Sequence, residues 1–337
     1  MEPKQVVLDS STKTEIIQDL SEKLKATYIF PDIAEKICDG LQKHLEEGDY
    51  REITEGRFFA YALTMHMQEV CQDQHLWVKW HPEPLPDQEG SNVHIQEWMD
   101  EQRLEAELDN FGIHKVERLP GNVGYIDLCQ FHKAEWGGAA AVAAMNFLEN
   151  TGALIIDLRN CLGGDPDMIV LISSYLFGEE KVLLNSIYWR DEDITQQYWT
   201  LPYIPGKRFY DKPVYVLIGK VTFSGGEEFA YNLKTRQRAV LVGEKTGGGA
   251  HPGASYRLHP HFEVFIPVGR AINPITNENW EGSGVLPDVY VSQEQALKVA
   301  YRLALKSIIE SIDEPVSGAY SQLLNEAQTA LEDLEAT

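Results

Sequence analysis

The sequence predicts an α/β protein, with a helical N-terminal subdomain followed by a core whose mostly parallel sheet is covered by helices. Three observations lead to this fold class. Apolar residues recur at helical spacing in the first 70 residues. From Asn122 onward, short apolar runs alternate with helical patterns, as in parallel sheets that are covered on both faces. The composition, 43% hydrophobic and 24% charged residues, is that of an ordinary globular chain.

The N-terminal region contains two amphipathic stripes. They consist of Ile16, Leu20, Leu24 and Tyr28, and of Ile33, Ile37, Leu41 and Leu45. Pro31 separates them, and a third helix is expected over 57–70. Residues 80–88 are rich in turn formers and predict an exposed loop. We therefore expect a helical subdomain over 1–85 and a linker over 86–121.

The core is expected over 122–306. Its predicted strands are 122–128, 153–159, 213–219 and 239–244, its predicted helices are 139–148 and 167–176, and 261–269 alternates like an edge strand. Residues 307–337 predict an acidic helical tail with one apolar face docked or paired.

The net charge of −23 argues against nucleic-acid and membrane-surface partners. Residues 1–110 hold 10 basic and 24 acidic side chains, residues 307–337 hold 7 acidic and no basic ones, and the middle is nearly neutral. No signal peptide or apolar run of about 20 residues is visible. The four cysteines lack metal or disulfide spacing, so we expect free thiols and a cytoplasmic location.

Two loops that follow apolar strands are candidate site loops, because ligands of α/β sheets bind beyond the carboxyl ends of strands. One contains Gly163 and Gly164, and the other places Ser224 directly before a helix. Ser224 and Glu227 form a capping-box pattern, which is the purely structural interpretation. The functional interpretation is a nucleophile with the Gly225 N–H as an oxyanion donor.

A nucleophilic serine needs a base, which can be distant in sequence. His75 lies in an Asp-x-His turn that leads into an alternating stretch, although an ordinary loop histidine would fit this context too. His251, His259 and His261 lack a nearby carboxylate or cysteine cluster of known geometry, so no metal and no cofactor is expected.

Seven stretches, in order, resemble the tail-specific (carboxyl-terminal processing) serine peptidases, in particular the branch of the interphotoreceptor retinoid-binding protein modules and the tricorn core protease. The stretches are 28–50, 73–78, 122–128, 155–165, 222–234, 242–253 and 280–291. The resemblance implies a helical N-terminal subdomain and a crotonase-like or ClpP-like core. Residues 93–121 are too few for the PDZ insert that is common in this family.

The resemblance also implies residue roles. Ser224 matches the nucleophile, His75 the general base and Glu281 the supporting carboxylate, while Gly225, Gly163 and Gly164 match the oxyanion hole. Two positions depart from family patterns. Gly249 stands where members with a Ser-Lys dyad have lysine, with Lys245 offset by four residues, and Gln74 stands where the tricorn-like tetrad has a second serine. In that tetrad the second serine bridges the histidine to the glutamate. Here the bridge is made by Gln74, bypassed, or missing.

The implied function is a serine peptidase that acts on peptides or unfolded C-terminal tails by Ser-His acyl transfer. The alternative is a weakly active or inactive module that binds a hydrophobic ligand such as a retinoid or fatty acid. Acyl-CoA chemistry has no specific support in the sequence. The expected partners are peptide or protein substrates, with a homo-oligomer formed through the N-terminal bundle or the C-terminal tail.

Overall fold

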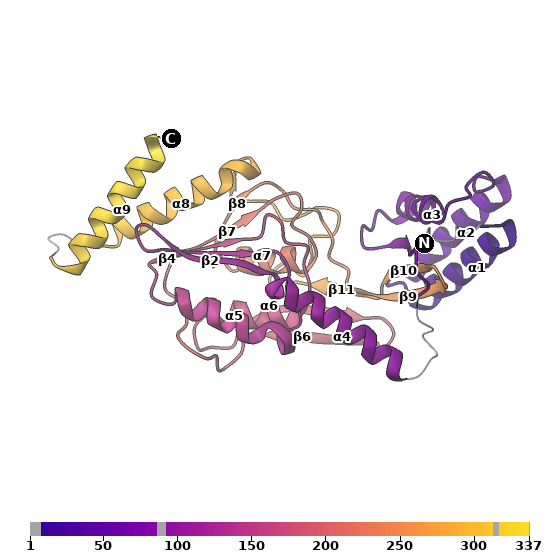
Figure 1. The fold of residues 1–337 in the computed structure, drawn as a ribbon, viewed down its shortest axis with the longest axis horizontal. Coiled ribbons are helices and arrows are strands. Elements are labelled where there is room, and N and C mark those ends of the chain that lie inside the picture. Colours follow the sequence, from indigo (N-terminus) through magenta and orange to yellow (C-terminus); the bar gives the residue numbers. More distant parts are fainter. Residues whose placement is uncertain (1–7, 86–91, 313–316, 337) are drawn as a thin grey trace. The chain divides into compact units, whose positions relative to one another are not determined.

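The structure is a computed structural model that describes residues 8–85, 92–312 and 317–336 (Figure 1). The chain divides into two compact units. The N-terminal unit comprises Met1–Asp100, Ile187–Gln196 and His251–Ala271, and the core unit comprises Glu101–Ser186, Gln197–Ala250 and Ile272–Thr337.

Three helices carry the apolar stripes of the N-terminal unit, namely α1 (Ser10–Thr27), α2 (Pro31–Glu47) and α3 (Gly56–Cys71). Asp9 caps α1 by accepting from the Thr12 N–H at 2.8 Å. Pro31 starts α2, and Gly48 ends it at φ 84°. The predicted stripes are buried in one hydrophobic cluster together with Phe59 and Leu63 of α3. The expected helical bundle is confirmed.

The same unit also contains an antiparallel sheet of order β1-β10-β9. It consists of β1 (Trp77–Trp80), β10 (Phe262–Pro267) and β9 (Gly253–His259), and β1 pairs Trp77 with Phe265. Val264 and Ile266 of β10 are buried in the cluster formed by the three helices. His75 lies in the short turn between α3 and β1, so this sheet fixes one end of its segment.

The core unit is built on a six-stranded sheet of order β12-β8-β7-β4-β3-β2. The strands are β2 (Ile113–Leu119), β3 (Val123–Leu128), β4 (Ala153–Asp157), β7 (Val214–Ile218), β8 (Val240–Gly243) and β12 (Val289–Tyr290). Only the β2–β3 pair among these is antiparallel. Every residue of β4 and β7 is buried, as expected for central strands covered on both faces.

Helices cover both faces of this sheet (Figure 1). The helix α8 (Gln293–Glu310) packs its buried alanines on residues such as Tyr125, Ile155 and Leu217. On the opposite face lie α5 (Ala134–Leu148), α6 (Pro166–Leu176) and α7 (Gly225–Thr235). The predicted mixed α/β architecture with a mostly parallel sheet is therefore confirmed.

Two parts of the expected domain organisation differ from the structure. The expected linker contains α4 (Asn92–Leu108), a short 3₁₀ turn (Asn110–Gly112) and the sheet strand β2, while residues 86–91 lie outside the described residues. The expected contiguous core is interrupted, because Ile187–Gln196 and His251–Ala271 belong to the N-terminal unit. These segments belong to the N-terminal unit because their strands pair with residues far away in the sequence, as β10 does with β1. Such pairing gives no pattern in the local sequence from which it could be predicted.

A third sheet, of order β11-β5-β6, contains three of the points at which the chain passes between units. Its strands are β5 (Leu183–Trp189), β6 (Ile194–Trp199) and β11 (Gly269–Ile272).

The C-terminal helix α9 (Ala319–Ala336) docks on the core unit, as the apolar face of the predicted tail indicated. Leu324 and Ala327 are buried, and Arg118 of β2 donates two hydrogen bonds of 2.9 Å to the Glu326 carboxylate. Among the described residues, no helix has both the length and the apolar character needed to cross a membrane. All four cysteines are free thiols, as predicted.

Candidate active site

Ser224 lies at a sharp turn between β7 and α7 in the core unit, and its backbone adopts φ 51° and ψ −120°. An ordinary N-cap residue has extended backbone angles, so helix capping alone does not explain the positive φ of Ser224. A non-glycine residue at positive φ costs roughly 1–3 kcal/mol, and such strain gathers at functional sites. A strained serine at a strand-to-helix turn is also how nucleophilic serines are exposed at a sheet edge.

The loop that carries Gly163 and Gly164 packs directly against this turn. Both glycines have positive φ, 108° and 131°. A Cβ atom added to Gly163 would lie 2.7 Å from the Gly225 nitrogen and 2.8 Å from the Ser224 Cβ, and one added to Gly164 would lie 2.1 Å from the Phe131 carbonyl oxygen. The close approach and the backbone angles both require glycine here. Gly225 is the first residue of α7, so its N–H has no acceptor within the helix.

Glu227 holds the Ser224 turn to a neighbouring loop. Its buried carboxylate accepts from the Ser224 N–H at 3.0 Å, which is one bond of the predicted capping box. It also accepts from the N–H groups of Gly248 at 2.7 Å and Gly249 at 2.8 Å and from the Thr246 hydroxyl. Burial raises the pKa of Glu227 to about 7, although these hydrogen bonds act in the opposite direction.

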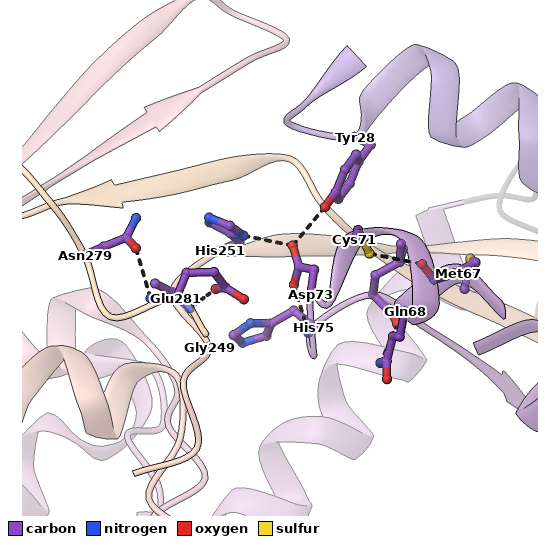
Figure 2. A network of polar contacts seen from close by, with 12 residues as sticks. Tyr28, Met67, Gln68, Cys71, Asp73, His75, Gly249, His251, Asn279 and Glu281 are labelled. Carbon is purple, nitrogen blue, oxygen red and sulfur yellow. Dashed lines mark hydrogen bonds and ion pairs between the residues drawn. The ribbon is translucent and has the colours of Figure 1, made fainter. Parts of the chain in front are cut away.

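Glu281 lies in the core unit and contacts the same loop. Its Oε2 accepts from the Ala250 N–H at 2.6 Å, and its own N–H donates to Asn279 at 3.0 Å (Figure 2). The Gly282 N–H donates to the Gly248 carbonyl at 2.9 Å. The loop over 246–250 therefore links Glu281 to Glu227 and, through Glu227, to the Ser224 turn.

His75 and Gln74 belong to the N-terminal unit. His75 is buried, with its ring centroid 6.1 Å from that of Phe265. Its backbone N–H donates to the Asp73 carboxylate at 3.0 Å. Burial lowers the pKa of His75 to about 4, because the desolvation of the charged ring outweighs the attraction of Asp73. At neutral pH the ring is therefore uncharged, which is the form that can accept a proton.

Asp73 is the centre of a polar cluster that the sequence did not reveal. Its other carboxylate oxygen accepts from the Tyr28 hydroxyl at 3.2 Å and pairs with Nδ1 of His251 at 2.8 Å (Figure 2). Asp73 and His251 are buried, and the His251 ring also makes an edge contact with Phe30. His251 thus pairs with a carboxylate rather than with His259 or His261, the combination considered from the sequence.

Four of the predicted site residues, Ser224, Gly225, Gly163 and Gly164, are brought into direct proximity, and Glu281 is linked to them through the loop over 246–250. Gly249 supplies a backbone N–H to Glu227 instead of a lysine side chain, and Lys245 is exposed. Sequence reasoning missed the structural roles of Asp73 and His251. It predicted the capping bond of Glu227 to Ser224 but not the bonds of Glu227 to Thr246, Gly248 and Gly249. The Asp-x-His pattern was the one available signal for Asp73.

The chain matches two protein-family models in sequence order. Residues 122–291 match peptidase family S41, and residues 4–113 match the N-terminal domain of peptidase S41 in eukaryotic IRBP.

The curated relatives include the carboxyl-terminal-processing protease of Synechocystis sp., 32% identical over 177 residues that cover 52% of this chain and 39% of the relative. They also include the chloroplastic carboxyl-terminal-processing peptidase 1 of Arabidopsis thaliana, 28% identical over 181 residues that cover 53% and 35%. The chain matches well under half the length of these relatives. A putative peptidase from Parabacteroides merdae has the same fold, with a TM-score of 0.58 at 16% identity, over 90% of this chain and 99% of that one.

Proposed function

Because the chain belongs to peptidase family S41, we propose that it is a serine peptidase that hydrolyses peptide bonds with Ser224 as nucleophile. The observation that carries this proposal is the strained Ser224 turn, packed against the Gly225 N–H and the Gly163–Gly164 loop. A helix N-terminus favours negative charge, so developing oxyanion charge is stabilised beside Ser224.

In the proposed reaction, His75 takes the proton from the Ser224 hydroxyl as the oxygen attacks a peptide carbonyl. The N–H groups of Gly225 and of the Gly163–Gly164 loop donate to the oxyanion. The protonated His75 then gives its proton to the leaving amine, and the acyl-enzyme forms. A water molecule, deprotonated by His75, attacks the acyl group, and the proton returns to Ser224 as the product acid leaves.

Glu281 is proposed to stabilise the charged form of His75, and Gln74 to support the histidine where tricorn-like relatives have a serine. Both roles are separate from nucleophilic attack. Replacing Glu281 or Gln74 should therefore slow the reaction without abolishing acylation, whereas replacing Ser224 should abolish it.

The proposed substrates are peptides or unfolded C-terminal tails, consistent with the names of the curated relatives. We also propose that the protein acts in the cytoplasm and that the N-terminal helices or α9 mediate self-association. Light scattering on the purified chain would measure the oligomeric state directly.

Labelling with a fluorophosphonate probe tests the nucleophile. The probe should phosphonylate the wild-type chain at one residue with loss of fluoride, that residue should be identified by mass spectrometry as Ser224, and Ser224→Ala should not react. Ser283→Ala is a matched control, because Ser283 is a serine of the core unit outside the proposed mechanism. If the wild-type chain stays unlabelled while an active serine peptidase reacts, the assignment fails and the ligand-binding alternative gains support.

A further inference from the structure

Three side chains of types that bind metals lie together in the core unit, and none of them is assigned a role in the reaction. They are His114, Asp127 and Cys129, and their donor atoms all lie within 4.8 Å of one another. Asp127 and Cys129 are two residues apart at the end of β3, so their side chains point to the same side.

His114 is directed by an irregularity of β2. The pairing between β2 and β3 shifts register between Ile113 and Lys115, which makes His114 the extra residue of a bulge. Bulges redirect a side chain relative to the regular alternation of a strand, and they occur frequently beside functional sites. The local backbone thus brings an imidazole to the side chains of Asp127, in β3, and Cys129, directly after it.

We propose that His114, Asp127 and Cys129 bind a zinc ion. Imidazole nitrogen, carboxylate oxygen and thiolate sulfur are the donor types that zinc takes in proteins. With tetrahedral angles and zinc distances of about 2.3 Å to sulfur and 2.0 Å to oxygen, these two donor atoms stand about 3.5 Å apart. Cys129 Sγ and Asp127 Oδ1 are 3.6 Å apart, so the spacing already suits the ion. Because His114 is exposed, water can supply a fourth ligand.

Asp109 supplies an outer contact of the kind that orients metal-binding histidines. Its Oδ1 lies 2.8 Å from Nε2 of His114, and its Oδ2 lies 3.5 Å from Nε2 of His132. A carboxylate on one ring nitrogen fixes the tautomer and leaves the other nitrogen available as a metal ligand. Zinc binding converts the Cys129 thiol to a thiolate, and the displaced proton passes to solvent.

The site is joined to the loop beside Ser224 through the backbone. The Cys129 carbonyl accepts from the Leu162 N–H at 3.1 Å, and the Phe131 N–H donates to the Gly163 carbonyl at 2.7 Å. An ion held by Cys129 therefore stiffens the segment that supports the Gly163–Gly164 loop. Zinc is a structural or regulatory ligand in this proposal and takes no part in the acyl transfer.

Titration of the metal-free full-length chain with Co²⁺ tests the site directly, because cobalt replaces zinc and a Co²⁺–thiolate bond gives a charge-transfer absorption. The wild-type chain should show this absorption and lose it when Zn²⁺ is added. Cys129→Ser should abolish the absorption, whereas Cys71→Ser, a matched change at a thiol of α3, should retain it. Asp109→Asn should weaken cobalt binding by about 10–100-fold.

His44, Glu47 and Asp49 of the N-terminal unit form another group of potential metal ligands, which could also bind the added cobalt. This group contains no thiol, so cobalt bound there gives no thiolate absorption. His114→Ala should weaken binding more than Asp109→Asn, while His44→Ala should leave the thiolate absorption unchanged. The proposal is overturned if no thiolate absorption develops in a folded wild-type chain, or if it persists in Cys129→Ser. The cobalt–thiolate absorption does not depend on the reactivity of Ser224. It therefore tests the zinc site even if the peptidase proposal fails.

Discussion

At the residue scale, the strained conformation of Ser224 has an identifiable compensation. The Glu227 carboxylate accepts four hydrogen bonds, from Ser224 and from three residues of the loop over 246–249. A hydrogen bond contributes roughly 0.5–1.5 kcal/mol net, so about two of these offset the roughly 1–3 kcal/mol of backbone strain. The same residue that completes the capping box therefore maintains the turn that exposes the proposed nucleophile.

The depressed pKa of His75 predicts activity in acid. If His75 is the base, the rate of Ser224 labelling by a fluorophosphonate should fall with a midpoint near pH 4, rather than near the ordinary histidine value of 6.5. A stopped-time labelling series over this pH range, restricted to conditions where circular dichroism shows a folded chain, measures it. A midpoint at 6.5, or a profile unchanged in His75→Gln, would remove His75 as the base.

The same pKa shift predicts a pH dependence of stability. The folded pKa of about 4 lies below the unfolded value of 6.5, so the unfolded chain binds the extra proton between these limits. The contribution of His75 is fully present above pH 6.5 and is lost as the pH falls through the folded value. The difference in free energy of unfolding between the wild type and His75→Gln should therefore become less favourable to the wild type from pH 6.5 to 4. Urea titrations at several pH values measure this difference.

Asp73 should be important for the stability of the N-terminal unit. It accepts hydrogen bonds from Tyr28, His75 and His251, so Asp73→Ala leaves buried donors without this acceptor. We expect a loss of about 3 kcal/mol in the free energy of unfolding, against about 1 kcal/mol for Tyr28→Phe, which removes a single bond. Equal effects in urea titrations would show that the Asp73 cluster does not act as a unit.

At the element scale, the Gly163–Gly164 loop requires backbone conformations and distances that only glycine meets. Gly164→Ala should abolish Ser224 labelling or reduce it by about 100-fold, the lower end of the effect of losing an oxyanion donor, because the new Cβ displaces the loop. Gly178→Ala is the matched control, since nothing lies within 4 Å of its added Cβ. Wild-type labelling rates in a folded Gly164→Ala would exclude the loop from the oxyanion site.

The elements that sequence patterns predicted are those with strong local signals. The buried runs that became β4 and β7 and the periodic stripes that became α1 and α2 agree with the structure to within a few residues. The Ser224 turn and the two glycines were found because they follow such strands directly. By contrast, β2 and β5 were missed, since mixed apolar and polar residues give such strands little periodicity and their positions depend on neighbouring strands.

The polar cluster around Asp73 could not be predicted from local sequence patterns either. His251 lies 178 residues from Asp73 in the sequence, and nothing near either residue indicates their pairing. A histidine that follows several glycines and precedes a proline has many interpretations, and only the fold selects one. The catalytic roles of Ser224, His75 and Glu281 remain predictions, because they concern reactivity and require measurement.

At the scale of the whole molecule, the charge of −23 predicts a substrate preference. The acidic residues are concentrated in residues 1–110 and in the C-terminal tail, so basic peptides should be attracted and acidic ones repelled. At low salt, kcat/KM should be higher for a basic peptide than for an acidic peptide with the same cleavage site. The difference should shrink towards 0.15 M salt, where screening acts within about 8 Å. Equal cleavage at low salt would contradict the hypothesis.

The pairing of β1 with β10 also has a consequence for the order of events during synthesis. Trp77 leaves the ribosome long before its partner Phe265, by roughly 10–40 s at ordinary elongation rates of about 5–20 residues per second. The edge of β1 that pairs with β10 therefore stays unpaired until β10 has been synthesised. By that time β2, β3, β4, β7 and β8 of the six-stranded sheet have all been synthesised and can assemble. Although β1 is synthesised before every strand of the parallel sheet, it is thus among the last strands to reach its native pairing, and a nascent chain arrested before residue 262 presents that edge to chaperones or to other chains.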